Sequence, residues 1–247
     1  MSSVVAIGSG KGGVGKTWLA ASLAHALARL GKRVLLFDGD LGLANVDVQL
    51  GLEPGPDLAS VLTGRCSFAQ AVRRFEPGGF DLIAGRSGCG QLSALSPQAL
   101  ATVLAELRAL APTYHHVLLD LPAGIDKVVR RLLAAADMPL VMTTDEPTAL
   151  TDAYALIKVS RTEVAGLAPQ LVVNQVRTHE VGQRTYEGLL RVCEHFLGLR
   201  PALAGILRHD PRVPEAIRQQ APFLVRSPTS PAARDLEALA THLASAG

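Results

Sequence analysis

Cysteine is scarce in this 247-residue sequence, which contains only Cys66, Cys89 and Cys193. They are odd in number, lie far apart and show no CxxC spacing, which argues against a disulfide framework and against a zinc site. No run approaches the roughly 20 apolar residues of a membrane span, and no basic region with an apolar signal core precedes the first predicted strand. We therefore expect a soluble protein of a reducing cytoplasm.

Net charge is also low, at +2, so the chain as a whole lacks the basic excess that is typical of nucleic-acid-binding proteins. Long linkers, repeats and low-complexity tracts are absent from the sequence as well. What is abundant is apolar sequence, because hydrophobic residues make up 48% of the chain, enough for a substantial core. We expect residues 1–247 to form a single domain.

Apolar β-type runs alternate with longer helical patterns almost to the end of the chain, which is typical of an α/β sheet protein. The predicted strands are Val4–Ile7, Arg33–Phe37, Phe80–Ala84, Val117–Leu121, Leu140–Thr143, Leu171–Val176 and Ala204–Leu207. The predicted helices include Trp18–Leu30, Pro97–Ala109, Lys127–Ala136, Thr151–Val164 and Gly182–Phe196. Because the strands are apolar at both alternations, we expect a mostly parallel, twisted sheet of seven or eight strands with helices on both faces.

The stretch Gly10–Thr17 (GKGGVGKT) lies between the first predicted strand and the first predicted helix, and it has the pattern of a phosphate-binding loop. Its glycines allow backbone N–H groups to approach a β-phosphate closely. Lys16 is expected to reach the β- and γ-phosphate oxygens, and Thr17 to bind Mg²⁺, at the positive end of the helix dipole. The nucleotide-contacting residues predicted in this stretch are Gly10, Lys11, Gly12, Gly13, Val14, Gly15, Lys16, Thr17 and Trp18. The fold class is therefore that of a P-loop NTPase.

Acidic residues follow two predicted strands. Asp38 and Asp40 come at the carboxyl end of the second, where open α/β sheets hold their ligands, so their carboxylates are expected to face Mg²⁺ and the attacking water. The apolar strand that ends in Asp120 has the pattern of a Walker B segment, and Asp120 is expected to hold Mg²⁺ through a water. Gly124 would let the backbone approach the γ-phosphate. The predicted metal-binding residues are Thr17, Asp40 and Asp120.

Asn174 ends a later predicted strand with an amide that both donates and accepts, so it can recognise the edge of adenine. A turn asparagine is the alternative. The segment 208–211 (RHDP) precedes a helix, and we assign no individual roles there.

The loop KGGVGKT, with Lys11 as a second lysine, resembles the deviant Walker A class, which includes the MinD/ParA ATPases and the nitrogenase iron protein. The resemblance implies ATP or ADP with Mg²⁺, slow hydrolysis stimulated by a partner, and an ATP-dependent homodimer in which Lys11 reaches the partner's nucleotide. It implies that Asp38 positions the hydrolytic water and that Asp40 responds to the γ-phosphate. The catalytic residues it implies are Lys11, Lys16, Asp38, Asp40 and Asp120. From the residues alone, a solvated loop charge at Lys11 and turn caps at the two aspartates remain alternatives.

Within that class, no cysteine follows the Walker B segment, which argues against a shared iron–sulfur cluster, and there is no late CxxC or terminal tyrosine cluster. The segments 38–47 and 145–158 closely resemble the MinD-like regulators of flagellar number, the FlhG/FleN group. That resemblance implies a cytoplasmic protein, placed at a cell pole, that acts on a flagellar GTPase, a transcription regulator or a C-ring component.

The chain also departs from that group. Its last predicted helix has a narrow apolar stripe and more acids than bases, so we expect it to pack on the core rather than bind anionic lipid. An N-terminal GTPase-activating extension is not expected either. The alternative function is a ParA-type DNA carrier, which is not favoured because its surface arginines are interleaved with acids. Those arginines are Arg200, Arg208, Arg212, Arg218 and Arg226. A metabolic ATP-dependent ligase is a third, disfavoured hypothesis.

Overall fold

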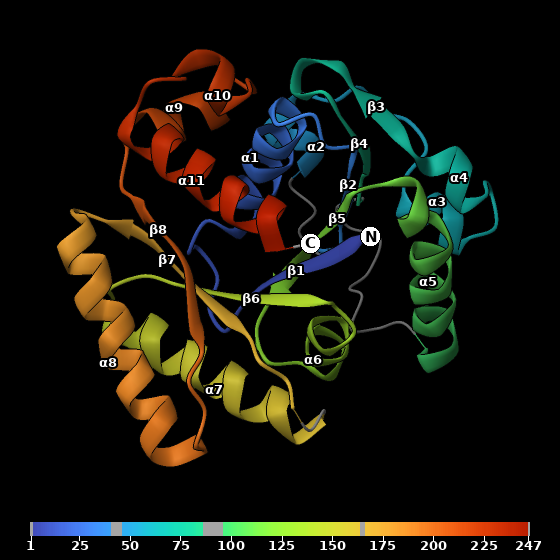
Figure 1. The fold of residues 1–247 in the computed structure, drawn as a ribbon. Coiled ribbons are helices and arrows are strands. Elements are labelled where there is room, and N and C mark those ends of the chain that lie inside the picture. Colours follow the sequence, from blue (N-terminus) through green and yellow to red (C-terminus); the bar gives the residue numbers. More distant parts are fainter. Residues whose placement is uncertain (1, 41–45, 86–95, 164–165, 247) are drawn as a thin grey trace.

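The computed structural model describes residues 2–40, 46–85, 96–163 and 166–246. Its strands form one eight-stranded sheet in the order β3-β4-β2-β5-β1-β6-β7-β8 (Figure 1). The strands are β1 (Ser3–Ser9), β2 (Val34–Asp38), β3 (Arg73–Phe75), β4 (Phe80–Ile83), β5 (His116–Ala123), β6 (Met138–Thr143), β7 (Gln170–Val176) and β8 (Ala202–Arg208). The helices are α1 (Lys16–Arg29), α2 (Val46–Leu50), α3 (Leu58–Leu62), α4 (Phe68–Ala71), α5 (Pro97–Leu110), α6 (Lys127–Ala134), α7 (Pro147–Glu163), α8 (His179–Leu197), α9 (Arg212–Arg218), α10 (Phe223–Arg226) and α11 (Pro231–Ala246), with short 3₁₀ turns η1 (Glu76–Gly78) and η3 (Ala111–Thr113).

The sheet confirms the predicted architecture. All pairings are parallel except that of β3 with β4, which is antiparallel at one edge. Each of the seven predicted strands is present. β3 was not predicted, because three residues that begin with Arg73 and Arg74 carry no apolar alternation.

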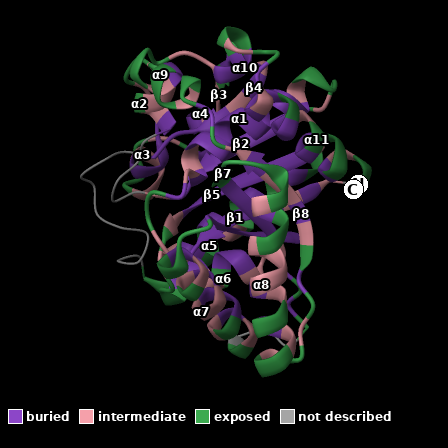
Figure 2. Ribbon diagram, turned by 90° about the vertical axis from the view of Figure 1, so that its left-hand side faces the viewer, coloured by how far each residue is buried: buried purple, intermediate pink, exposed green. Residues whose placement is uncertain are grey.

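Helices cover both faces of the sheet, and the strand alternation divides the core into two layers. Val5 and Ile7 of β1 pack with residues of α1, α9, α10 and α11, whereas Ala6 packs on the opposite face with residues of α3 to α8. Figure 2 shows the buried strands, and it shows exposed residues on helices such as α8 and α11. Residues at both alternations of β1, β2, β5 and β6 are buried, as the apolar strand segments predict.

The C-terminal helix α11 lies on the same face as α1 (Figure 1). Its stripe of Leu236, Leu239 and Leu243 is buried, each residue at most 1% exposed, so this stripe belongs to the core. The expectation that the last helix packs on the core is confirmed. None of the helices in the described ranges is long and apolar enough to cross a bilayer.

The short helices α2, α3, α4 and α10, of four or five residues, were not predicted, whereas α9 is the helix expected after the segment 208–211. One or two turns are too few for a helical period to appear in the sequence. Two of them are nonetheless marked by caps: the side chain of Asp57 accepts from the backbone of Ser60, and Ser67 and Gln70 form a capping box. Cys66 and Cys193 are free thiols, and Cys89 lies outside the described residues.

Candidate nucleotide-binding site

The loop Gly10–Thr17 lies at the carboxyl end of β1, between β5 and β6 in the sheet, the position at which open α/β sheets bind ligands. Gly15 is the N-cap of α1 and has a φ of 92°, a left-handed conformation that favours glycine. A Cβ added to Gly10 would lie 2.2 Å from the carbonyl oxygen of Asp152 in α7. Only glycine therefore fits at this approach of the loop to α7.

Lys16 begins α1 and is 9% exposed. Its Nζ donates to Ser9 Oγ at 2.8 Å, and Ser9 Oγ donates in turn to the carbonyl oxygen of Lys11 at 2.6 Å. Burial lowers the pKa of Lys16, and the carboxylates of Asp120 and Asp40 oppose that effect. The ammonium is thus held at the loop by one neutral hydroxyl and two nearby acids, a position from which it can bind a phosphate.

Asp38 and Asp120 end neighbouring parallel strands and are paired in register. Both are at most 1% exposed. Burial first, and then the charge of Asp120, raise the pKa of Asp38 well above its usual range, while hydrogen bonds from the backbone of Asp40 and Val46 act in the other direction. Burial also raises the pKa of Asp120 to about 6, although the neighbouring Thr17 hydroxyl and Lys16 ammonium lower it. Two carboxyl groups are thereby concentrated where a cation would stabilise their ionised forms.

Asp40 lies close to this pair, since its N–H donates to Asp38 Oδ1 at 3.1 Å and its charge contributes at both Lys16 and Asp120. Within the segment 38–47, residues 41–45 lie outside the described residues. Gly124 follows β5 with a φ of 121°, and its N–H donates to the carbonyl oxygen of Ser9 at 2.9 Å. The structure thus brings Asp38, Asp40, Asp120 and Gly124 around the loop.

Lys11 points to α7 rather than back into its own loop. Its Nζ forms an ion pair with Glu146 Oε2 at 2.7 Å and donates to Thr148 Oγ1 at 2.9 Å. The side chains of Lys11 and Glu146 are 37% and 62% exposed, so this ion pair is open to solvent. Lys11 is therefore held in place by contacts that solvent can replace.

Asn174 and Gln175 tie the end of β7 to the loop. Asn174 is 3% exposed and its Nδ2 donates to the carbonyl oxygen of Val14 at 2.8 Å. Gln175, at a φ of 60°, donates to Gly13 at 3.3 Å. One of the two N–H groups of the Asn174 amide is thus used on the loop, and the other N–H and Oδ1 remain for a ligand.

A pocket of about 430 Å³ extends from the loop past these amides to the end of β8 and α9, and we call it the nucleotide pocket. It is lined by Gly13, Gly15, Trp18, Asn174, Gln175, Arg208, His209, Asp210, Val213, Pro214, Ile217 and Arg218. Arg208 does not offer its charge freely, because Asp235 on α11 accepts from its Nε and Nη2 at 2.9 and 2.8 Å. Residues 208–210 thus line this pocket together with α9, as does the start of α1 at Trp18.

Sequence reasoning missed several contributors. Ser9, which holds Lys16, ends an apolar strand and resembles any strand-end serine. Glu146 and Thr148 were noted only as part of a familial segment, and the ion pair to Lys11 spans 135 positions. Gln175 was within the quoted strand, yet its left-handed backbone has no sequence signature in a residue other than glycine.

The residues present fit a magnesium-bound nucleotide. Both carboxylate oxygens of Asp120 are buried without a hydrogen-bond partner among the described residues. No group of three or more His, Cys, Asp or Glu residues in the described part of the chain is arranged to hold a metal by itself. That is the arrangement expected for Mg²⁺, which is commonly held by one or two carboxylates together with substrate phosphates.

Fold and site together define a P-loop nucleoside triphosphatase with a second lysine in its loop. A family model described as the CobQ/CobB/MinD/ParA nucleotide binding domain matches residues 5–223. The chain belongs to this family and is a MinD/ParA-type ATPase.

Similar proteins cover nearly the whole chain. The antiactivator FleN of Pseudomonas aeruginosa is 36% identical over 237 residues, which are 96% of this chain and 84% of that protein. The flagellum site-determining protein YlxH of Helicobacter pylori is 34% identical over 78% of this chain and 68% of its own length. The septum site-determining protein MinD of Pyrococcus horikoshii, solved in complex with Mg-ADP, superposes with a TM-score of 0.81 at 25% identity and covers 98% of this chain and 96% of that one.

Proposed function

We propose that this protein is a single-domain ATP-dependent switch that dimerises with Mg-ATP, hydrolyses ATP slowly and regulates the number or placement of flagella. The observation that supports it most directly is Lys11, a loop lysine that contacts Glu146 and Thr148 instead of its own phosphate site. Flagellar regulation is favoured over other positioning processes by the resemblance to FleN and to the flagellum site-determining YlxH.

Lys11 is suited to leave its contacts when a second nucleotide site approaches. An exposed ion pair contributes only about 0–1 kcal/mol, and a lysine side chain is long and flexible. A triphosphate on a partner subunit offers more negative charge than Glu146 alone, so exchange of one partner for the other is favourable. Dimerisation would then depend on the γ-phosphate.

Within one subunit, the predicted catalytic residues have places in the proposed reaction. Lys16 binds the β- and γ-phosphate oxygens. Thr17 and Asp40 would hold the cation, Asp120 would hold it through a water, and Asp40 also responds to the γ-phosphate. Bound Mg²⁺ supplies charge neutralisation at the phosphates. Asp38, whose pKa is raised by burial, lies beside Asp120 and is positioned to orient the attacking water and accept its proton. Asn174 Oδ1 is left to accept from the amino group of adenine.

The test compares the mass in solution of wild type and Lys11→Ala with Mg-ADP and with a non-hydrolysable ATP analogue. We expect wild type to dimerise with the analogue only, and Lys11→Ala to bind nucleotide yet stay monomeric. Lys32→Ala is the matched control, because Lys32 lies beyond the carboxyl end of α1, away from the loop. This variant should dimerise like wild type. Dimers of Lys11→Ala would refute the proposed role of Lys11, and a monomer under every condition would refute the switch.

The alternative of a DNA carrier gains no support from three of the five candidate arginines. Arg200, Arg208 and Arg212 form ion pairs with Glu194, Asp235 and Asp210. Their charge is therefore offset locally, whereas phosphate binding requires several clustered cations that are free to release counterions. We accordingly propose a protein partner for the ATP-bound dimer rather than DNA.

A further inference from the structure

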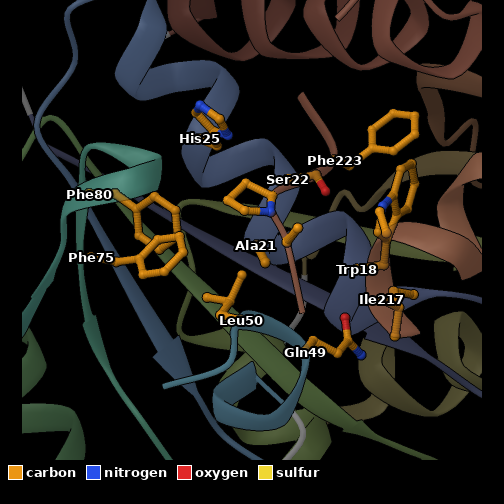
Figure 3. A pocket seen from close by; sticks show the side chains of 13 residues that line it. Trp18, Ala21, Ser22, His25, Gln49, Leu50, Phe75, Phe80, Ile217 and Phe223 are labelled. Atoms are coloured by element: carbon orange, nitrogen blue, oxygen red, sulfur yellow. The ribbon is translucent and has the colours of Figure 1, made fainter. Parts of the chain in front are cut away.

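Trp18 lies at the boundary between the nucleotide pocket and a second hollow. This inner pocket is lined by thirteen residues of α1, α2, β3, β4, α9 and α10 and of the chain between α9 and α10, among them Ser22, His25, Gln49 and Phe223 (Figure 3). Trp18 and Ile217 are the two residues that line both pockets. Both residues therefore contribute to the wall between the two pockets.

The indole of Trp18 turns its polar edge away from the nucleotide pocket. Nε1 is buried and has no hydrogen-bond partner among the described residues, and in Figure 3 the nitrogen lies on the side of the ring that faces the inner pocket. The lining of that pocket contains no acidic residue, lysine or arginine, and burial, followed by the charge of Arg29, lowers the pKa of His25. What Trp18 offers the nucleotide pocket is thus uncharged ring surface and not a donor.

The ring is held in one orientation. Trp18 is 7% exposed, and Phe223 of α10 meets it edge to face, with ring centroids 5.5 Å apart and planes at 74°. The inner pocket has little free space behind the ring, so a bound nucleotide meets a fixed apolar wall. A preorganised wall contributes to affinity without ordering a loose side chain first.

Trp18 lines the nucleotide pocket together with the loop glycines Gly13 and Gly15 and with Val213 of α9. The phosphates belong with the loop N–H groups and Lys16, and an indole without an exposed N–H is a poor ligand for them. The uncharged part of the ligand, its sugar and base, is the part that gains from an apolar aromatic surface.

We propose that Trp18 is a specificity-determining residue that binds the nucleoside half of the ligand and makes the site select nucleotides over bare polyphosphates. The inference rests on the proposed function only in that the loop binds a nucleoside triphosphate. Selectivity then comes from two separate parts of one helix: Lys16 for phosphate, and Trp18, two residues on, for the nucleoside.

The experiment measures competition of Mg-ATP and of magnesium tripolyphosphate against a fluorescent ADP analogue, for wild type, Trp18→Ala, Trp18→Phe and Lys16→Ala. We expect Trp18→Ala to raise the Kd of ATP about tenfold while that of tripolyphosphate changes less than about twofold. Trp18→Phe keeps an aromatic wall and should stay within about threefold of wild type for both. Lys16→Ala should weaken both ligands.

Phe223→Ala is the structural control, because Phe223 supports the ring but does not line the nucleotide pocket. Phe223→Ala should lower the melting temperature. It should change the ratio of the Kd of ATP to the Kd of tripolyphosphate less than Trp18→Ala does. Equal weakening of both ligands by Trp18→Ala, or no weakening, would overturn the inference. Failure of wild type to bind ATP would instead refute the proposed function.

The tryptophan fluorescence of the wild-type protein gives a second readout that needs no variant, since Trp18 is the single tryptophan of the chain. Saturating ATP should change its emission spectrum, because ring surface in the nucleotide pocket becomes covered, whereas saturating tripolyphosphate should leave it nearly unchanged. Identical spectral changes with both ligands would contradict contact between Trp18 and the nucleoside.

Discussion

The phosphate end and the base end of the nucleotide pocket are built in different ways. At the phosphate end, one uninterrupted stretch, Gly10–Thr17, folds as the turn between β1 and α1 and presents its own backbone. At the base end, side chains come from α1, β7, the end of β8 and α9, up to 200 positions apart along the chain, from Trp18 to Arg218. The first end is therefore determined by backbone conformation, and the second by how distant elements pack.

This difference predicts different responses to substitution. At Gly10 in the phosphate end, an added Cβ has no room, because the loop backbone lies against the backbone of α7 there. At the base end, loss of one side chain leaves the others in place. One substitution that displaces the backbone at the phosphate end should therefore abolish nucleotide affinity. Each substitution at the base end should remove only part of it.

The largest effect is expected for Gly10→Ala. The new Cβ would lie 2.2 Å from the carbonyl oxygen of Asp152, so the loop or α7 must move, at a cost of about 3 kcal/mol in unfolding free energy. Nucleotide binding should fall below detection, as measured by calorimetry alongside urea unfolding.

The matched control is Gly12→Ala in the same loop, where the nearest atom to an added Cβ is Ala123 Cβ at 3.9 Å. It should lose less than about 1 kcal/mol of stability. If both variants were equally stable, the close contact between the loop and α7 would not constrain the phosphate end.

An intermediate effect is expected for Asn174→Ala at the base end. The change removes the buried donor to Val14, which costs about 1–2 kcal/mol of unfolding free energy. It also removes Oδ1, so the preference for ATP over GTP should fall about tenfold. Competition of ATP and GTP for the same site measures the second effect.

Gln175→Ala is the neighbouring control, because its 3.3 Å contact to Gly13 is longer and exposed. Gln175→Ala should therefore lose less unfolding free energy and less preference for ATP over GTP than Asn174→Ala. A variant Asn174→Ala that discriminated between ATP and GTP like wild type would show that the base is recognised elsewhere in the pocket.

The same division explains what the sequence allowed us to predict. The parallel sheet, the loop and the acids Asp38 and Asp120 were accessible because each depends on a local pattern: an apolar strand, a glycine run, or an acid at a strand end. The register that places Asp38 beside Asp120 was not predicted, because the rule that ligands bind at the carboxyl ends of parallel strands indicates only that both acids lie at that edge of the sheet.

Contacts between distant residues were not accessible in this way. Nothing local indicates that Lys11 contacts Glu146, or that the amide of Asn174 is directed to Val14. Trp18 was predicted only as the next residue of the loop and helix. Its place between two pockets depends on Phe223 and Ile217, more than 190 positions further along the chain.

The smallest effect on nucleotide binding is expected for Asp235→Ala, which acts on the base end from outside the pocket. Asp235 accepts from the backbone and guanidinium of Arg208, and His179 Nε2 lies 2.9 Å from its Oδ1. Removing the carboxylate leaves Arg208 at the pocket without its partner, which should cost about 2 kcal/mol of stability. ATP affinity should change by only about threefold or less, because Arg208 is one of many lining residues.

Glu237→Ala on the same helix is the control, since the ion pair of Glu237 with Arg29 is exposed on both sides and should contribute less than about 1 kcal/mol.

The pH dependence of the unfolding free energy shows whether Asp235 acts through its charge. Burial raises the pKa of Asp235, but the hydrogen bonds from Arg208 outweigh it and hold that pKa below its ordinary value. A carboxyl group with a lowered pKa stabilises the fold above its unfolded pKa, near 4, and that contribution is lost as the pH falls through the folded value. The stability difference between wild type and Asp235→Ala should therefore be present at pH 7 and shrink below about pH 4. A difference that stayed constant to pH 3 would mean that Asp235 acts by packing alone, and that the base end of the pocket does not depend on its charge.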